Sequence, residues 1–243
     1  MKRALITGGM SGLWKQLAYI ALEKWYKVDV LDISRGEIDE IPQNMNYIHS
    51  DISKIDDTLG EKLSEKYDMV MCNAGISLSG NFIDHSYDDN KRLMNINTLW
   101  HMELIRILIT QKRLQRWGSI WFIASASEML PFPIALWYSA SKGALRAFAV
   151  SLRSCLIGTK VSVSVVYPWP MPTAHVKYYG KEISHNEKNL KKIRSIAKKV
   201  LRWTEKWKRN IYPDMVSKIL TITNPFNPIL DRIMFRSYKK DIT

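Results

Sequence analysis

The hydrophobic positions of the chain form short apolar runs separated by longer segments. The runs, rich in β-branched residues, occupy residues 3–6, 27–32, 67–72, 118–125 and 160–168. Residues 88–113 and 138–157 carry the long helices predicted between them. Strands that alternate with helices are typical of βαβ units, whose crossovers are right-handed. The pattern therefore predicts an α/β fold of three αβα layers, with a doubly wound, mainly parallel sheet of six or seven strands.

The length of the chain favours a single domain. Its 243 residues suffice for one large α/β domain and are short for two. No internal repeat or low-complexity linker divides the sequence. After Pro168 the pattern loosens into a proline-rich loop, a basic helix and an apolar C-terminal segment. We therefore expect one domain over residues 1–243, of which residues 169–243 are the variable part.

The charge of the chain raises the question of an anionic partner. Its formal net charge is +13, and such a field attracts nucleic acid, anionic lipid or acidic cofactors. Much of this charge lies in residues 186–210, where apolar residues at helical spacing predict an amphipathic helix with a solvated basic face. Peripheral membrane contact is the alternative for this helix. No base-reading motif accompanies the charge, so we expect no specific nucleic-acid partner.

Neither the cysteines nor the start of the chain indicates an extracellular or metal-binding protein. Cys72 and Cys155 cannot form a disulfide framework and do not have metal-ligand spacing, so we expect free thiols and no metal. The first residues enter a strand directly, and no run of 18 apolar residues occurs. These features predict a cytoplasmic protein.

A glycine-rich turn, TGGMSG at residues 7–12, follows the first apolar run and precedes a helix. Glycines there allow a tight turn and close approach of a pyrophosphate to the helix N-terminus, as in a Rossmann fold. A plain strand-to-helix turn is the alternative. Asp32 ends the second run, where a carboxylate binds the ribose hydroxyls of NAD and repels the extra phosphate of NADP. A helix cap or a solvated turn is the alternative for Asp32.

A second candidate site is the segment YSASK, residues 138–142. Residues four apart share one face of a helix, so the Lys142 ammonium can lie near the Tyr138 phenol. A neighbouring cation favours the phenolate and lowers the pKa of a tyrosine, which suits a general acid in carbonyl reduction. Ser125 ends the preceding strand, where its hydroxyl can hold a substrate oxygen. An ordinary surface pair is the alternative for Tyr138 and Lys142.

Seven landmarks, in this order, resemble those of the short-chain dehydrogenase/reductase family over residues 3–175. They are TGGMSGL at residues 7–13, Asp51, CNAG at 72–75, Asn97, Ser125, YSASK at 138–142 and PWPMPT at 168–173. The resemblance implies that Tyr138 exchanges the proton, Lys142 binds the nicotinamide ribose, Ser125 orients the carbonyl and Asn97 supports a proton relay. Hydride then moves directly between the nicotinamide and the substrate carbon.

The resemblance also implies the residues that bind the cofactor, NAD with NADP as the alternative. They are Thr7, Gly8, Ser11, Gly12, Leu13, Asp32, Asp51, Ile52, Asn73, Ala74, Gly75, Tyr138, Lys142, Pro168 and Thr173. Family members pair through the helices that correspond to residues 88–113 and 138–157, so we expect a homotetramer or homodimer. The substrate pocket would form from residues 169–243, where the family varies.

The chain departs from the family pattern in its tryptophans. Trp14, Trp25, Trp100 and Trp169 stand where family members usually have glycine. Nine tryptophans and eleven glycines together make about 8% of the residues, close to the ordinary glycine share of about 7%. UGA encodes tryptophan in one variant genetic code and glycine in some bacterial lineages, so we interpret the nine tryptophans as glycine codons read as tryptophan. A divergent relative with true tryptophans, its cofactor site crowded by Trp14 and Trp169, is the alternative.

The residues thus favour an oxidoreductase that transfers hydride between a nicotinamide dinucleotide and an alcohol or carbonyl substrate. A catalytically silent Rossmann protein that binds a nucleotide or a partner is the alternative. The presence of Asn97, Ser125, Tyr138 and Lys142 together favours the enzyme, because a scaffold does not need all four.

Overall fold

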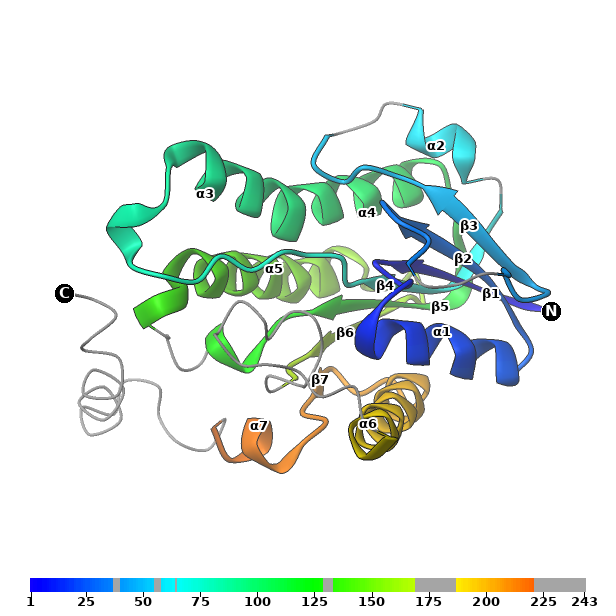
Figure 1. Cartoon of the computed structure of the whole chain (residues 1–243). Helices are drawn as coiled ribbons and strands as arrows, with labels where there is room; N and C mark the ends of the chain where they lie inside the picture. The colour runs from blue at the N-terminus through cyan, green and yellow to red at the C-terminus, as the bar shows by residue number, and fades with distance from the viewer. Residues whose placement is uncertain (37–39, 55–57, 64, 129–132, 169–186, 221–243) are drawn as a thin grey trace.

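A single parallel sheet of seven strands forms the centre of the molecule, in the order β3-β2-β1-β4-β5-β6-β7 (Figure 1). The computed structural model describes residues 1–36, 40–54, 58–63, 65–128, 133–168 and 187–220. The strands are β1 (Lys2–Thr7), β2 (Tyr26–Asp32), β3 (Met45–His49), β4 (Tyr67–Cys72), β5 (Leu114–Ile123), β6 (Ser162–Val166) and β7 (Asn210–Ile211). The predicted fold class, a doubly wound αβα Rossmann fold, is confirmed.

Helices cover both faces of the sheet (Figure 1). They are α1 (Gly12–Glu23), α2 (Leu59–Lys62), α3 (Tyr87–Met94), α4 (Trp100–Thr110), α5 (Leu136–Cys155), α6 (Glu187–Glu205) and α7 (Met215–Leu220). One core cluster joins α1 and α6 to the sheet through Leu17, Ile20, Ile196 and Val200. A second cluster joins α2, α4 and α5 to the opposite face through Leu59, Leu104, Leu108 and Leu145. The apolar, nearly continuous strands are therefore buried on both sides, as parallel strands require.

Several predicted boundaries differ from the observed elements by a few residues, as in α5 and β6, and two differences have a clear structural reason. The helix predicted over residues 88–113 is divided into α3 and α4 by a π-helical turn, Asn95–Leu99, because hydrophobic spacing alone does not reveal a change from α to π bonding. Strand β5 begins at Leu114 rather than at residue 118, since its first residues are exposed or half-buried and form no apolar run.

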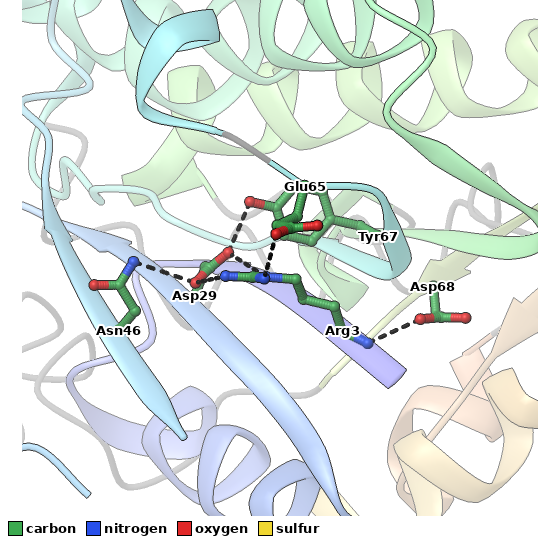
Figure 2. Close-up of polar contacts among 6 residues, drawn as sticks. All are labelled: Arg3, Asp29, Asn46, Glu65, Tyr67 and Asp68. Atoms are coloured by element: carbon green, nitrogen blue, oxygen red, sulfur yellow. Dashed lines mark hydrogen bonds and ion pairs between the residues drawn. The ribbon is translucent and has the colours of Figure 1, made fainter. Parts of the chain in front are cut away.

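A polar network around Asp29, the fourth residue of β2, joins four neighbouring strands (Figure 2). The Asp29 carboxylate is nearly inaccessible, with the residue only 3% exposed. It accepts from Arg3 Nε at 2.9 Å, from the Tyr67 hydroxyl at 2.8 Å and from Asn46 Nδ2 at 3.3 Å. Because each oxygen of this buried charge has donors, its desolvation is offset by specific partners. The network fixes the relative positions of β1, β2, β3 and β4.

Three tryptophans adopt a left-handed backbone conformation that normally favours glycine. Trp25, Trp117 and Trp207 have φ values of 64°, 73° and 57°. Their side chains are 78%, 55% and 46% exposed. A bulky residue in this region of φ carries a steric cost of about 1–2 kcal/mol. These three positions are therefore strained by their own Cβ atoms. Trp117 and Trp207 stack on each other with ring centres 5.5 Å apart, whereas Trp25 is mostly exposed.

Candidate active site

The turn between β1 and α1 is too tight for side chains at its glycines. Gly8 has φ +66°, and a Cβ added to it would lie 2.9 Å from Ala74 Cα. At Gly9 an added Cβ would lie 2.9 Å from Val30 Cγ1. Helix α1 then begins at Gly12 after Ser11, its N-cap residue. A bare backbone leading into a helix N-terminus fits a dinucleotide pyrophosphate.

Thr7 joins this turn to the segment after β4. Its Oγ1 accepts hydrogen bonds from the backbone N–H groups of Asn73 at 2.9 Å and Ala74 at 3.0 Å. In return, Asn73 Nδ2 donates to the Thr7 carbonyl at 3.0 Å. The structure thus brings together the two glycine-containing segments that the sequence assigned to cofactor binding.

Asp32 lies directly beside the turn. Its Oδ2 accepts from the backbone N–H of Met10 at 3.0 Å, and its Oδ1 accepts from Ser34 at 3.3 Å. The neighbouring Arg35 guanidinium stacks over the Tyr47 ring at 5.3 Å. A carboxylate is therefore fixed at the carboxyl end of β2, where the ribose of a bound dinucleotide would lie.

The remaining predicted cofactor residues lie on different segments, and one of them lies outside the described residues. Asp51 follows β3 and accepts from the Ser53 N–H at 2.9 Å; hydrogen bonds from Ser53 lower its pKa. Ile52 packs against the second core cluster. The Pro168 carbonyl accepts from Ala126 N–H at 3.2 Å, which joins the segment after β6 to the segment after β5. Leu13 lies in the first turn of α1. Thr173 lies outside the described residues.

Tyr138 and Lys142 lie one turn apart on α5, and both are buried. The Lys142 ammonium is 5.7 Å from the centre of the Tyr138 ring and donates to the Ile123 carbonyl at 3.0 Å. Ile123 is the last residue of β5, so this bond fixes α5 against the end of that strand. Burial lowers the pKa of Lys142 to about 8. The Lys142 ammonium therefore lies near the Tyr138 ring, where α5 meets the end of β5.

Ser125 lies two residues after Ile123, the last residue of β5, rather than at the end of the strand as predicted, and it is buried. Its Oγ accepts from the backbone N–H of Ser127 at 3.1 Å. This bond leaves the hydroxyl proton available to a further acceptor, because a serine hydroxyl both donates and accepts.

Asn97 lies in the π-helical turn with both ends of its amide bonded. Oδ1 accepts from Ile76 N–H at 2.8 Å, while Nδ2 donates to the Ile76 carbonyl at 2.9 Å and to Ser141 Oγ at 3.0 Å. A Cβ added to Gly75 would lie 2.9 Å from Asn97 Oδ1 and 3.5 Å from Lys142 Nζ. Asn97 and Lys142 therefore both reach the same point on the chain, with only a glycine between them.

Three buried polar residues of this region had no role in the sequence-based prediction. Ser141 Oγ accepts from Asn97 and donates to the Tyr138 carbonyl at 2.7 Å. His101, four residues after Asn97, contacts both Thr7 and Asn97. Glu128 forms a 3.1 Å ion pair with Arg146. The helical spacing of Ser141 and His101 relative to Tyr138 and Asn97 was a usable signal, whereas the position of Glu128 depends on the tertiary fold.

The chain matches the family described as short chain dehydrogenase over residues 2–184. It belongs to the short chain dehydrogenases. An uncharacterized short-chain type dehydrogenase/reductase of Sinorhizobium fredii is 30% identical over 173 residues, which cover 70% of each chain. The 3-ketodihydrosphingosine reductase of Bos taurus is 30% identical over 182 residues, 68% of this chain and 54% of that protein.

Solved structures of short chain dehydrogenases share the fold of this one. A short chain dehydrogenase from Burkholderia cenocepacia, in complex with NADP, covers 100% of both chains with a TM-score of 0.77 and 18% identity. A relative from Burkholderia phymatum, in complex with NAD, has a TM-score of 0.73 at 18% identity and covers 93% of this chain and 97% of its own. Neighbours of this dehydrogenase thus bind either dinucleotide.

Two further properties of this dehydrogenase concern only the residues that the structure describes. Among them, no helix is long and apolar enough to cross a membrane. Within the same residues, no group of three or more His, Cys, Asp or Glu side chains is arranged to hold a metal ion.

Proposed function

We propose that this short chain dehydrogenase transfers hydride between NAD(H) and an alcohol or carbonyl substrate, with Tyr138 as the general acid and base. The observation that carries the proposal is the buried Lys142 ammonium 5.7 Å from the Tyr138 ring. When bound, the dinucleotide supplies or accepts the hydride. The bare backbone at Gly8 and Gly9 fits its pyrophosphate.

The side chains of the site transfer the proton, bind the carbonyl oxygen and position the catalytic groups. Lys142 stabilises the Tyr138 phenolate, so that the phenol can give its proton to a carbonyl oxygen near neutral pH. Ser125 donates a hydrogen bond to the same oxygen. Asn97, bonded to Ile76 and Ser141, holds the start of α5 beside the segment after β4. The cofactor residues Thr7, Asn73 and Ala74 keep the pyrophosphate turn in place.

Asp32 favours NAD over NADP. Its carboxylate, fixed by Met10 and Ser34, would face the 2′-phosphate of NADP with like charge. Arg35 could receive that phosphate only by leaving its stacked position over Tyr47. Titration with both dinucleotides tests this preference: we expect tighter binding of NADH, and tighter binding of NADPH would overturn it.

We expect a homodimer or homotetramer formed through α4 and α5. Three apolar side chains of this region are exposed: Leu99 in the π-helical turn, Ile109 on α4 and Val150 on α5. Exposed apolar patches are typical of subunit contacts. Sedimentation should show more than one subunit; a monomer at micromolar concentration would contradict this assembly.

Three expectations from the sequence stay predictions. They are cytoplasmic localisation, a single domain over residues 1–243 and the absence of a specific nucleic-acid partner.

We also infer that the protein made by its organism carries glycine at the tryptophan positions. The left-handed φ values of Trp25, Trp117 and Trp207 support this inference. Trp25 also stands at a family glycine position, whereas the φ values of Trp117 and Trp207 do not depend on the family pattern. Trp14 is half-buried in the first turn of α1 and packs against the first core cluster, so the chain as written retains α1. Trp169 lies outside the described residues.

The gene and the native protein test the tryptophan inference directly. We expect UGA codons at all nine positions, and peptides of the native protein with the mass of glycine there. Native peptides with the mass of tryptophan at Trp25 or Trp117 would overturn the inference. Trp121 fits it least, because its indole is buried in β5 and donates to Ser119 Oγ at 3.0 Å.

Loss of the Tyr138 hydroxyl tests the enzymatic function. NADH consumption is followed with 2-octanone and acetoacetyl-CoA, chosen because one relative is named a ketoacyl reductase. We expect Tyr138→Phe to lower turnover by at least about 100-fold while NADH binding changes little. Tyr87→Phe, at an exposed tyrosine of α3, is the matched control. NADH binding without turnover of either ketone by the parent, or unchanged turnover by Tyr138→Phe, would favour the catalytically silent alternative.

A further inference from the structure

A fully buried histidine connects the cofactor turn with the segment that carries Asn97. His101 Nε2 lies 3.1 Å from Thr7 Oγ1, and His101 Nδ1 lies 3.3 Å from the main-chain carbonyl of Asn97. The imidazole therefore bridges the end of β1 and the π-helical turn.

The hydrogen bonds of Thr7 determine which ring nitrogen carries the proton. Thr7 Oγ1 already accepts from the N–H groups of Asn73 and Ala74, so both of its lone pairs are occupied. Its own proton must point elsewhere, toward His101 Nε2 at 3.1 Å or the Met71 carbonyl at 3.3 Å. In either case Thr7 cannot accept from Nε2. The ring proton therefore lies on Nδ1, where it donates to the Asn97 carbonyl.

The surroundings keep the ring neutral and its tautomer fixed. Burial, with the nearby Lys142 charge, lowers the pKa of His101 to about 3. Cys72 interacts electrostatically with the same lysine; burial raises the pKa of its thiol, which stays protonated. His101 thus offers one donor and one acceptor over the whole neutral range.

The Asn97 carbonyl belongs to a stretch where backbone bonding departs from the α-helix. In an α-helix this carbonyl would accept from the backbone N–H of residue 101. In the π-helical turn, the Trp100 N–H reaches the Asn95 carbonyl, five residues back. Here the Nδ1–H of the His101 side chain, one helical turn later, donates to the Asn97 carbonyl. Its bond therefore acts where the helix is least fixed by its own backbone.

We propose that His101 is a positioning residue that holds Asn97, through its main-chain carbonyl, in register with the cofactor turn at Thr7. This inference rests on the proposed dehydrogenase function. The Asn97 amide reaches both Ile76 and Ser141, and Ser141 bonds to the Tyr138 carbonyl. A shift of the π-helical turn would therefore move the start of α5, which carries Tyr138 and Lys142. A small misplacement of such groups costs up to about 100-fold in rate.

Three substitutions separate the two bonds of the ring. His101→Asn can keep an N–H near the Nδ1 position and loses the contact with Thr7. His101→Gln can reach Thr7 and loses the bond to Asn97. His101→Phe keeps the ring shape and loses both bonds. Leu108→Ala, at a fully buried residue of the same helix that contacts the second core cluster, is the control for general destabilisation.

We expect His101→Phe to lower kcat by about 10-fold or more with little change in the KM for NADH. His101→Asn should recover more of kcat than His101→Gln, while Leu108→Ala loses stability with kcat nearly unchanged. The proposal is overturned if the His101→Phe kcat stays within about two-fold of the parent, or if His101→Gln recovers as much as His101→Asn. Should the phenylalanine variant not fold, the Asn and Gln variants decide by the same comparison.

The ring nitrogens provide a readout that does not depend on catalysis. Nitrogen NMR of the full chain should show His101 as the neutral Nδ1–H tautomer from pH 5 to pH 9. The Nε2–H tautomer, or titration within this range, would overturn the bridge itself. A parent that shows the expected tautomer but no turnover with either ketone would instead contradict the proposed function.

Discussion

The ammonium nitrogen of Lys142 lies 5.7 Å from the ring centre of Tyr138 and is bonded to the last carbonyl of β5. This position is useful for chemistry and unfavourable for stability. Burial lowers the pKa of Lys142 from 10.5 to about 8, so the folded state binds this proton more weakly than the unfolded state. The resulting cost is complete below pH 8, decreases as pH rises from 8 to 10.5, and vanishes above that range.

We therefore expect Lys142→Met to lack this cost. Its free energy of unfolding, relative to the parent, should be greatest below pH 8, by at most about 3 kcal/mol, and the difference should decline toward pH 10.5. Urea denaturation at pH 7, 9 and 10 measures the difference. The exposed Lys27→Met variant should show no such pH trend. A Lys142→Met difference that is constant with pH would contradict a depressed lysine pKa.

Glu128 should make stability depend on pH in the opposite direction. Burial raises its pKa to about 8 despite Arg146, so the folded state binds the proton more tightly than the unfolded state between pH 4.5 and 8. Stability then falls as pH rises through this window, by at most about 1.4 kcal/mol per pH unit.

Glu128→Gln removes this titration and tests the Glu128 effect. We expect the variant to gain stability over the parent as pH is raised from 5 to 8 in thermal unfolding. The exposed Glu61→Gln variant serves as the control. Parallel stability curves for Glu128→Gln and the parent would show that Glu128 is charged throughout.

The Asp29 network should be the most sensitive polar site outside the active region (Figure 2). Asp29→Ala leaves the Arg3 guanidinium and the Tyr67 hydroxyl without their buried acceptor, so we expect a loss of about 3–5 kcal/mol in the free energy of unfolding. Glu65→Ala removes a mostly exposed partner of Arg3 at 3.5 Å and should change stability little. Similar urea midpoints for the two variants would refute a structural role for Asp29.

Glycine at Trp25 should stabilise the chain as written. The side chain is 78% exposed, and its backbone has φ 64°, so Trp25→Gly removes strain with little loss of packing. We expect a gain of about 1 kcal/mol in the free energy of unfolding. Trp203→Gly is the contrasting control, because Trp203 packs against the first core cluster from within α6 and should lose stability. A loss on Trp25→Gly would count against glycine as the native residue.

Much of the fold follows from local sequence patterns. Strand β4 coincides with its predicted residues 67–72, since both its ends are marked by polar neighbours and every interior residue is apolar or half-buried. The division between α3 and α4 could not be predicted, because π bonding at Asn95–Leu99 preserves the hydrophobic spacing of one continuous helix. The first residues of β5 escaped prediction because they are mostly exposed, and Leu114 pairs with Tyr67 before an irregularity in the register.

The candidate site was predictable where residues carry a motif and unpredictable where they act through the fold. The helical spacing of Tyr138 and Lys142 places both on one face of α5, as found. His101 and Thr7 are separated by 94 positions, so no local pattern relates them. The acid–base roles of Tyr138 and Ser125 stay predictions until turnover is measured.

Helix α1 packs against α6, a segment that is synthesised much later. Arg194 of α6 pairs with Glu23 of α1 across 171 positions, and apolar residues of both helices share one core cluster. During synthesis at about 5–20 residues per second, the nascent α1 therefore waits roughly 10–30 s for α6. Throughout that delay α1 can pack against β1 and β2, but the part of its apolar surface that contacts α6 is uncovered. We expect the growing chain to need a holding chaperone at this stage, and the packing of this face of the sheet to be completed only after α6 leaves the ribosome.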